Sequence, residues 1–301
     1  ADGRLTLLAG HPSEAGFADG QRVEARFNGI FGLAMERGGS VLVSDCYNHS
    51  VRRVSRHGQV TTVAGNGEDG FADGVGNAAG FNWPVGIDVD SQGLIYVADT
   101  GNHCIRRVQP ADGTVSTLCG KGKEPGCANG PAAEARFTWP SGLALDMNED
   151  LIVADDGNHN VRKVALPHGG VTVVAGSMNG GDEGAGDVDA PGTAARFHRP
   201  VSVAVDGDNA IFVADFGNDL VRRISGDGGV VETFWSNDEV GESTSCIDEP
   251  DFVAINGKGQ LLLVDEYDLF VVQAMVPPPR LRPTAMETVD QKALRMLQTD
   301  Y

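Results

Sequence analysis

The chain is predicted to be an all-β protein, a β-propeller built from four-stranded antiparallel blades. A similar element recurs five times, and its leading aspartates are Asp45, Asp99, Asp155, Asp215 and Asp265. These aspartates lie 54, 56, 60 and 50 residues apart, and a period of this size is typical of repeat architectures. The longest apolar runs have the length of strands, and 41 glycines supply the tight turns that a strand-rich repeat needs. The sequence therefore predicts a propeller.

The second repeat shows most clearly how each period resolves into four strands. Strands are expected at residues 85–89, 94–98, 105–108 and 114–118. The segments between them contain Asp, Gly, Pro and Ser, the residue types that reverse a chain tightly. Four consecutive antiparallel strands make one propeller blade.

The number of blades follows from counting the fourth strand of each repeat. This strand occurs within the chain at residues 60–64, 114–118, 171–175 and 230–234, and the last repeat lacks one after its third strand at 269–275. Residues 4–10 have a similar sequence to 60–65. We therefore expect the N-terminal strand to join the last repeat and close a ring of five blades, which would leave no raw sheet edge. Six blades are the alternative.

The recurring element resembles the NHL repeat, which is named for its Asn-His-Leu element. The second copy reads Asp99-Thr-Gly-Asn-His-Cys-Ile-Arg-Arg-Val108. Two copies depart from the pattern, since Asp219 replaces the histidine in the fourth and the fifth lacks the Asn, the His and both arginines. The resemblance implies an NHL-type propeller over residues 1–275. Residues 276–301 lie outside the repeats, and their prolines and apolar spacing predict a Pro-rich spacer and a short C-terminal tail of helical character. NHL propellers often have six blades, which is why six remains the alternative.

The net charge and the spacing of the cysteines indicate which binding partners and which cellular compartment to expect. The net charge is −19, with much of the acid in loops, so the surface repels the phosphate backbones of nucleic acids. No apolar run approaches the roughly 20 residues of a membrane-spanning helix. The spacings of the five cysteines, Cys46, Cys104, Cys119, Cys127 and Cys246, match neither a disulfide framework nor a zinc site. We therefore expect reduced thiols, with Cys119 and Cys127 as the pair to check for a bridge, in an intracellular, cytoplasmic protein.

The motif residues are expected to be structural. The aspartate that ends the second strand lies across one hairpin from the paired basic residues, which point to opposite faces, so Asp99 should pair with either Arg106 or Arg107. The turn histidines His49, His103 and His159 belong to different blades and cannot converge on one ion. The phenylalanines that end the long connectors should pack between blades; they are Phe27, Phe81, Phe137 and Phe197.

The residue after each of these phenylalanines, or its equivalent, enters the innermost strand. These five polar residues could ring the mouth of the central channel: Asn28, Asn82, Thr138, His198 and Asp248. Such side chains suit either a cation or a hydrated channel mouth. No cofactor and no metal ligands are otherwise predicted.

Topology identifies the candidate binding face. In an antiparallel blade, the turn between the second and third strands lies on the same side as the long connectors, and long loops on a rigid scaffold usually carry recognition. We call this the long-loop face, and its opposite the short-turn face. Candidate aromatic anchors on the long-loop face are Tyr47, Phe71, Trp83, Trp139, Phe216 and Tyr267, with Glu68, Asp69 and Asp73 as acidic neighbours.

Taken together, these features favour a non-catalytic scaffold module that binds a protein partner with a basic patch. The first alternative is a propeller-type metal-dependent hydrolase or a lyase, because amidating enzymes share this repeat. The second alternative is an RNA-binding domain, because some NHL propellers bind RNA on a basic face. The acidic loops argue against RNA.

Overall fold

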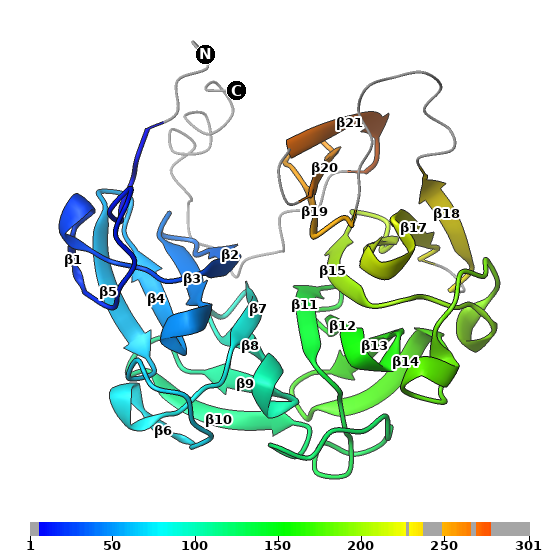
Figure 1. The fold of residues 1–301 in the computed structure, drawn as a ribbon, viewed down its shortest axis with the longest axis horizontal. Helices are drawn as coiled ribbons and strands as arrows, with labels where there is room; N and C mark the ends of the chain where they lie inside the picture. The colour runs from blue at the N-terminus through cyan, green and yellow to red at the C-terminus, as the bar shows by residue number, and fades with distance from the viewer. Residues whose placement is uncertain (1–5, 227–228, 237–248, 266–268, 278–301) are drawn as a thin grey trace.

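The protein is a β-propeller of antiparallel sheets arranged around a centre (Figure 1). The computed structural model describes residues 6–226, 229–236, 249–265 and 269–277. In each sheet the blade strands follow one another outward in sequence order, from the innermost strand to the outermost. The prediction of an all-β propeller is confirmed.

The strands fall into five sheets. The first contains β1 (Gly20–Gln21), β2 (Ile30–Met35), β3 (Val41–Asp45), β4 (Ser50–Val54) and β5 (Gln59–Ala64), in the order β1-β5-β4-β3-β2. The second contains β6 (Gly74–Val75), β7 (Pro84–Val89), β8 (Ile95–Asp99), β9 (Cys104–Val108) and β10 (Thr114–Cys119), in the order β6-β10-β9-β8-β7. The third contains β11 (Pro140–Leu145), β12 (Leu151–Asp155), β13 (Asn160–Ala165) and β14 (Gly170–Gly176). The fourth contains β15 (Pro200–Val205), β16 (Ile211–Asp215), β17 (Leu220–Ile224) and β18 (Val231–Trp235), and the fifth β19 (Phe252–Ile255), β20 (Gln260–Val264) and β21 (Leu269–Met275).

Short 3-10 helices occupy the hairpins and the connectors. They are η1 (Arg22–Glu24), η2 (Cys46–Asn48), η3 (Gly76–Ala78), η4 (Thr100–Asn102), η5 (Asp156–Asn158), η6 (Asp182–Gly184), η7 (Gly192–Ala194) and η8 (Phe216–Asn218). No helix in the described part of the chain has the length and apolarity needed to cross a membrane.

The predicted number of blades is wrong. Four sheets have the full set of four blade strands, whereas the fifth has three strands within the described residues. The structure thus shows four complete blades, and neither five nor six. In the first two sheets, a two-residue strand of the preceding connector, β1 or β6, also pairs with the outermost strand.

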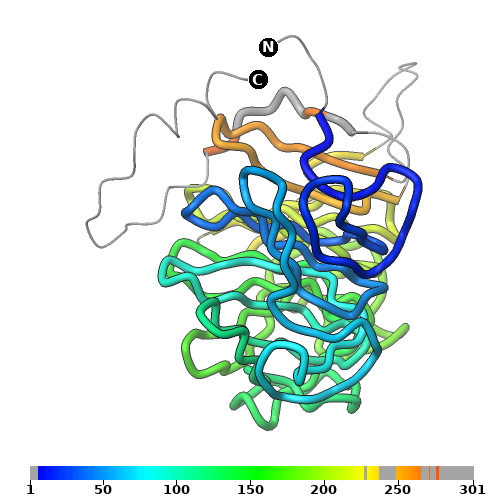
Figure 2. The backbone as a smooth tube through the Cα atoms, turned by 90° about the vertical axis from the view of Figure 1, so that its left-hand side faces the viewer, coloured from blue at the N-terminus to red at the C-terminus, as the bar shows by residue number. Residues whose placement is uncertain are grey.

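The N-terminal segment does not close the ring as predicted. Arg4 and Leu5 lie outside the described residues, and residues 6–10 are not a strand. The backbone N–H of Gly10 donates to the Arg22 carbonyl at 2.9 Å, and Arg22 Nη2 donates to the Leu7 carbonyl at 3.3 Å. These bonds hold the segment against its own connector, on the side of the first sheet, as Figure 2 shows for the dark blue part of the chain.

The hydrophobic core lies between consecutive sheets. One cluster joins Ile105 of the second sheet to Leu143 and Val153 of the third and to Phe137 of the connector between them, all nearly inaccessible to solvent. The innermost strands approach closely because small residues face the neighbouring backbone. A Cβ atom added at Gly86 of β7 would lie 2.3 Å from the Ser141 carbonyl of β11. The predicted packing role of the connector phenylalanines is confirmed for Phe81, Phe137 and Phe197, which are fully buried.

Candidate functional site

The long-loop face is held together by the aspartate that ends the second strand of each complete blade. In the second blade, Asp99 Oδ1 accepts from the backbone N–H of Asn82 at 2.7 Å. Its Oδ2 accepts from Asn102 Nδ2 at 2.9 Å and from Arg106 Nη1 at 2.7 Å. The same arrangement recurs around Asp45, Asp155 and Asp215. The predicted buried pair therefore exists, and Arg106 is its cation.

Arg106 connects this aspartate to the long connector. Its side chain is inaccessible to solvent, and Nη2 donates to Asp73 Oδ1 and to the Ala72 carbonyl, both at 2.8 Å. The guanidinium carbon lies 5.0 Å from the centre of the Phe71 ring and 5.3 Å from that of Phe81. Cation–π contacts of this kind add stability when the cation is desolvated. The loops of the face are thus tied to the rigid blades.

Burial strongly affects these carboxyl groups. Desolvation raises the pKa of Asp99 to about 6, although Arg106 and the N–H donors favour the ionised form. Desolvation likewise raises the pKa of Asp155 and of Asp215 to about 6. The negative charge of each aspartate is compensated by the buried arginine of the same blade.

In three of the four complete blades, the second basic residue of the pair forms an ion pair with a nearby carboxylate. Arg53 forms an ion pair with Glu36, Lys163 with Asp146 and Arg223 with Glu232. These pairs support the structural interpretation of the paired basic residues over a row of free cations.

The turn histidines link neighbouring blades. Nδ1 of His49 accepts from the backbone N–H of Trp83 at 3.2 Å, and Nδ1 of His103 accepts from that of Trp139 at 3.1 Å. Nδ1 of His159 accepts from Arg199 in the same way, at 2.9 Å. An accepting Nδ1 is unprotonated, so these rings are neutral. Burial lowers the pKa of His49, His103 and His159, which favours that state.

Asp219 takes over this role in the fourth blade. Its Oδ1 accepts from the backbone N–H of Glu249, which precedes β19 of the fifth sheet, at 2.8 Å. The replacement of histidine by Asp219 therefore keeps a hydrogen-bond acceptor at this position, although a carboxylate takes the place of the imidazole. Sequence reasoning had assigned the histidines to turn structure, and it missed this link because the donor lies in the next repeat.

Exposed aromatic side chains follow the inner part of the long-loop face. Trp83 and Trp139 are 45% and 39% exposed, and their rings stack with centroids 6.0 Å apart. His103 meets Trp139 edge-on at 4.9 Å. Tyr47, which is 51% exposed, contacts Phe31 at 5.8 Å. We call Phe31, Tyr47, Trp83 and Trp139 the aromatic row.

The other predicted binding residues are placed differently. Phe71 packs on Arg106, and the Phe216 ring lies 5.1 Å from the guanidinium carbon of Arg199. Glu68 and Asp69 are exposed, whereas Asp73 is the counter-ion of Arg106. Tyr267 lies outside the described residues. Phe31 was not predicted, although its position near the start of the first inner strand, β2, could have suggested it.

The predicted channel-mouth residues serve the blade through their backbones. The N–H groups of Asn28, Asn82, Thr138 and His198 each donate to the motif aspartate of their blade. The His198 ring also bonds through Nδ1 to the Gly217 carbonyl at 2.9 Å. Asp248 lies outside the described residues, so the predicted cation at this ring stays a prediction.

Within the described residues, the thiols and the potential metal ligands form no reactive or metal-binding group. No three His, Cys, Asp or Glu side chains among them are grouped so as to hold a metal ion. Cys46, Cys104, Cys119 and Cys127 are free, so no bridge joins Cys119 to Cys127. Burial raises the pKa of the Cys46 thiol to about 12. This thiol is therefore protonated at neutral pH.

Comparison with known proteins supports the resemblance to NHL repeats. The NHL repeat family profile matches residues 81–108. The chain is 28% identical over 309 residues to human NHL repeat-containing protein 2, covering 91% of this chain and 42% of that protein. It is 27% identical over 273 residues to the Arabidopsis thaliana protein SUPPRESSOR OF QUENCHING 1, chloroplastic, covering 85% and 26%. The chain thus spans less than half the length of these relatives.

Solved structures share the fold. A gluconolactonase from Xanthomonas campestris superimposes with a TM-score of 0.58 at 16% identity, covering 86% of this chain and 77% of that one. A chain of a nidogen/laminin complex gives a TM-score of 0.57, also at 16% identity, covering 81% and 74%. Similarity at this level of identity shows the propeller fold alone.

Proposed function

Because the chain is an NHL-repeat β-propeller, we propose that it is a non-catalytic interaction module whose protein partner binds the long-loop face. The observation that carries this proposal is the aromatic row, which exposes Tyr47, Trp83 and Trp139 on one surface. Exposed aromatic side chains of this size dominate binding energy at protein interfaces. An exposed row of them is costly for a surface that binds nothing.

The framework beneath the row favours binding because it is already ordered. The buried arginines fasten the connectors, and the histidine links hold the backbones of Trp83 and Trp139 in place. Little conformational entropy is therefore lost when a partner binds.

The charge of the face suggests the nature of the partner. Glu68 and Asp69 are exposed next to the row, and the whole chain has a net charge of −19. A partner with a basic rim would be attracted over a distance, and salt would slow its association.

Substitution of the two tryptophans tests the proposal. Trp83 and Trp139 have positive φ angles, so each is changed to Asn, which tolerates that backbone. Partners are first captured from the native source with the unmodified chain, and the affinity of each purified partner is then measured. We expect the double variant to bind at least about tenfold more weakly, as hot-spot residues do.

A matched control is available on the outer edge of the second sheet. Val75 of β6 is 53% exposed, and Val75→Asn should leave affinity unchanged. Glu68→Lys with Asp69→Lys should slow association, whereas Asp73 is left intact because it pairs with Arg106. An interface mapped wholly to the short-turn face would refute the proposal.

A further inference from the structure

Arg199 occupies in the fourth blade the position that Trp83 and Trp139 occupy in the second and third. These three residues have left-handed backbones, with φ angles of 50° for Trp83 and 54° for the other two. The backbone N–H of each donates to the turn histidine of the preceding blade. Arg199 therefore continues the aromatic row around the long-loop face, and its side chain is 50% exposed.

The buried motif arginines show what a guanidinium group binds in this protein. Arg106 binds two carboxylates, Asp99 through Nη1 and Asp73 through Nη2, with two phenylalanine rings against its guanidinium group. Arg52 and Arg222 also bind at least two carboxylates each and lie close to a phenylalanine ring. In three blades, an arginine beside an aromatic ring thus has two carboxylate partners.

Arg199 has one ring and one carboxylate. Its Nε donates to Asp156 Oδ1 at 3.2 Å, and its Nη2 donates to Asp156 Oδ2 at 3.5 Å. The Phe216 ring lies 5.1 Å from the guanidinium carbon. Within the described part of the chain, nothing accepts from Nη1, and no second carboxylate pairs with this guanidinium group. Arg199 therefore keeps unused donors although its side chain is already held in place.

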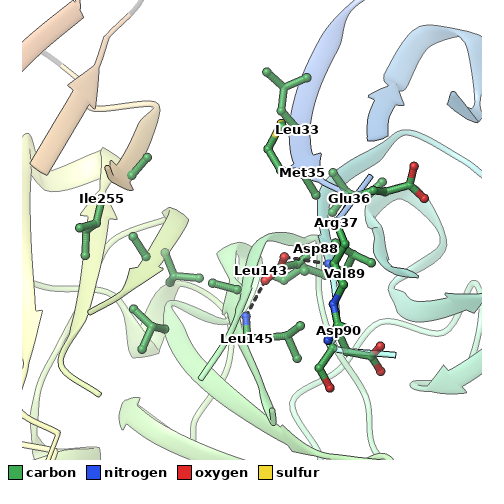
Figure 3. Close-up of a pocket in the computed structure, with 18 of the residues that line it drawn as sticks. Leu33, Met35, Glu36, Arg37, Asp88, Val89, Asp90, Leu143, Leu145 and Ile255 are labelled. Carbon is green, nitrogen blue, oxygen red and sulfur yellow. Dashed lines mark hydrogen bonds between the residues drawn. The ribbon is translucent and has the colours of Figure 1, made fainter. Parts of the chain in front are cut away.

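Arg37 shows the difference between a held arginine and one that is not held. Arg37 lines a cavity of about 1030 Å³ between the inner strands, where Figure 3 shows it on the same side as Leu33 and Met35. It forms no ion pair and no cation–π contact with any described residue. A ligand would have to order this side chain, which costs conformational entropy. Arg199 is the better binding group because Asp156 and Phe216 already fix its guanidinium plane.

A second donor of the same cluster also has no acceptor among the described residues. His159 is only 5% exposed, and its Nδ1 accepts from the backbone N–H of Arg199. The proton of the neutral ring is therefore on Nε2. Buried donors are normally paired, so this N–H favours a ligand that brings an acceptor.

The chemistry of the cluster favours a carboxylate over other ligands. A metal ion at Nε2 of His159 would require an imidazolate, because Nδ1 must stay unprotonated to accept from Arg199. A phosphate group would bring close to two negative charges next to Asp156. A carboxylate brings one negative charge, and it is the group that the other arginines of this protein bind.

We propose that Arg199 binds a side-chain carboxylate, from an aspartate or a glutamate, of the protein partner that the aromatic row binds. This inference rests on the proposed function. The carboxylate accepts from Nη1 and Nη2, as Asp73 accepts from Nη2 of Arg106. Glu68 and Asp69, in the connector between the first and second blades, attract basic residues instead. The two parts of the face therefore select opposite charges, and the partner binds in one orientation.

Peptide selection on the full chain tests this proposal. A random library of twelve-residue peptides on phage is selected on the wild type, and peptides that fail to bind the double variant Trp83→Asn, Trp139→Asn are kept. These peptides are synthesised with capped ends, so that side chains supply every carboxylate. Fluorescence polarisation then measures their affinities.

We expect the selected peptides to contain an acidic residue and to bind Arg199→Gln at least about tenfold more weakly than the wild type, as for a lost charge-assisted hydrogen bond. Conversion of that acidic residue to its amide should weaken binding to the wild type to a similar extent. It should have little further effect on binding to Arg199→Gln, because the two groups act together.

Two further variants serve as controls. Arg223→Gln removes another partly exposed, ion-paired arginine, on β17, and should leave the affinities unchanged. Arg199→Lys keeps the charge but lacks the planar fork, and should recover part of the affinity. Thermal unfolding confirms that each variant is folded.

The outcomes separate this proposal from the proposed function. Peptides that need the tryptophans but bind Arg199→Gln unchanged would overturn the carboxylate site and leave the aromatic row as a binding surface. Selected peptides without acidic residues would do the same. A library that yields no peptide dependent on the tryptophans would count against both proposals.

Discussion

The junctions between successive blades and the uncovered side of the first blade use similar residues but differ greatly in burial. At the junction of β7 and β11, Ile87 and Leu143 are almost inaccessible, whereas Leu33 at the same register of β2 is 58% exposed. The inner strands of all four complete blades thus carry a large apolar residue at this position, whether or not a neighbouring blade covers it. The repeat therefore encodes an inner strand with an apolar side that needs to be covered by the preceding blade. The arrangement of the blades in the ring decides which inner strands are covered in this way.

Hydrogen bonds between side chain and backbone also hold the junctions between successive blades together. Each junction has a motif side chain that accepts a backbone N–H from the next blade, namely His49, His103, His159 and Asp219. Three of these acceptors are imidazoles and one is a carboxylate, so the junction requires an acceptor at a fixed place and tolerates a change of residue type.

Removal of a motif aspartate should have the largest effect. Asp99→Ala leaves the buried Arg106 without its main counter-ion, which typically costs about 3–5 kcal/mol. Glu232→Ala is the matched control, because its pair with Arg223 is solvent-exposed and worth at most about 1 kcal/mol. Unfolding free energies from urea titration compare the two. Similar losses in both variants would contradict the structural role assigned to the aspartate.

Truncation of the equivalent apolar residues directly tests the comparison. Leu143→Ala should destabilise the protein by about 2–5 kcal/mol, because it leaves a cavity between two blades. Leu33→Ala should cost clearly less, because more than half of its surface is already accessible in the described structure. Denaturant titration measures both. If Leu33→Ala proves as costly as Leu143→Ala, the two regions are equally buried and the contrast does not hold.

Loss of one histidine link should have a moderate effect. His103→Ala leaves the backbone N–H of Trp139 without its acceptor and should cost about 1–3 kcal/mol. His103→Asn restores an oxygen acceptor at a left-handed position that Asn tolerates, and should recover part of that loss. Thermal unfolding of the two variants, followed side by side, provides the measurement. Equal stability of both would show that the accepted hydrogen bond contributes nothing.

The pH dependence of the same link should be the smallest effect. Burial lowers the pKa of His103 in the folded protein, so below its usual value the unfolded chain binds more protons than the folded one. This contribution to stability is therefore complete above about pH 6.5 and is lost as the pH falls toward the lowered pKa, by at most about 1.4 kcal/mol per pH unit. Because the buried aspartates titrate in both proteins, the difference between the wild type and His103→Asn isolates the histidine. A difference that is constant from pH 7 to pH 5 would contradict the link.

Several features of the fold could be predicted because they lie within one hairpin. The pairing of Asp99 with a motif arginine follows from seven residues of separation across a single turn, and only the choice of Arg106 over Arg107 awaited the structure. The long-loop face was also predictable, since strand alternation fixes which turns share a side. The stacking of Trp83 on Trp139 could not be predicted in this way, because it involves two repeats.

Other features could not be predicted because they depend on how separate repeats meet. Residues 4–10 resemble a fourth strand, yet the described residues 6–10 lie along the first sheet through bonds with Arg22. Asp73 resembled a free acid of the binding face, but Arg106, 33 residues further along the chain, binds it. Strand propensity and charge are local properties, and neither specifies a distant partner.

The sequence by itself determined the propeller fold, the internal pairing of each hairpin and the side on which the long loops lie. These depend on short-range spacing, which the chain repeats about every 55 residues and which backbone geometry translates directly into strands and turns. The tertiary structure alone decided the number of complete blades, the acceptors that join one blade to the next and the uncovered side of β2. Those features arise from contacts between residues in different repeats, where the geometry of the whole ring determines which apolar side chains and N–H groups find partners.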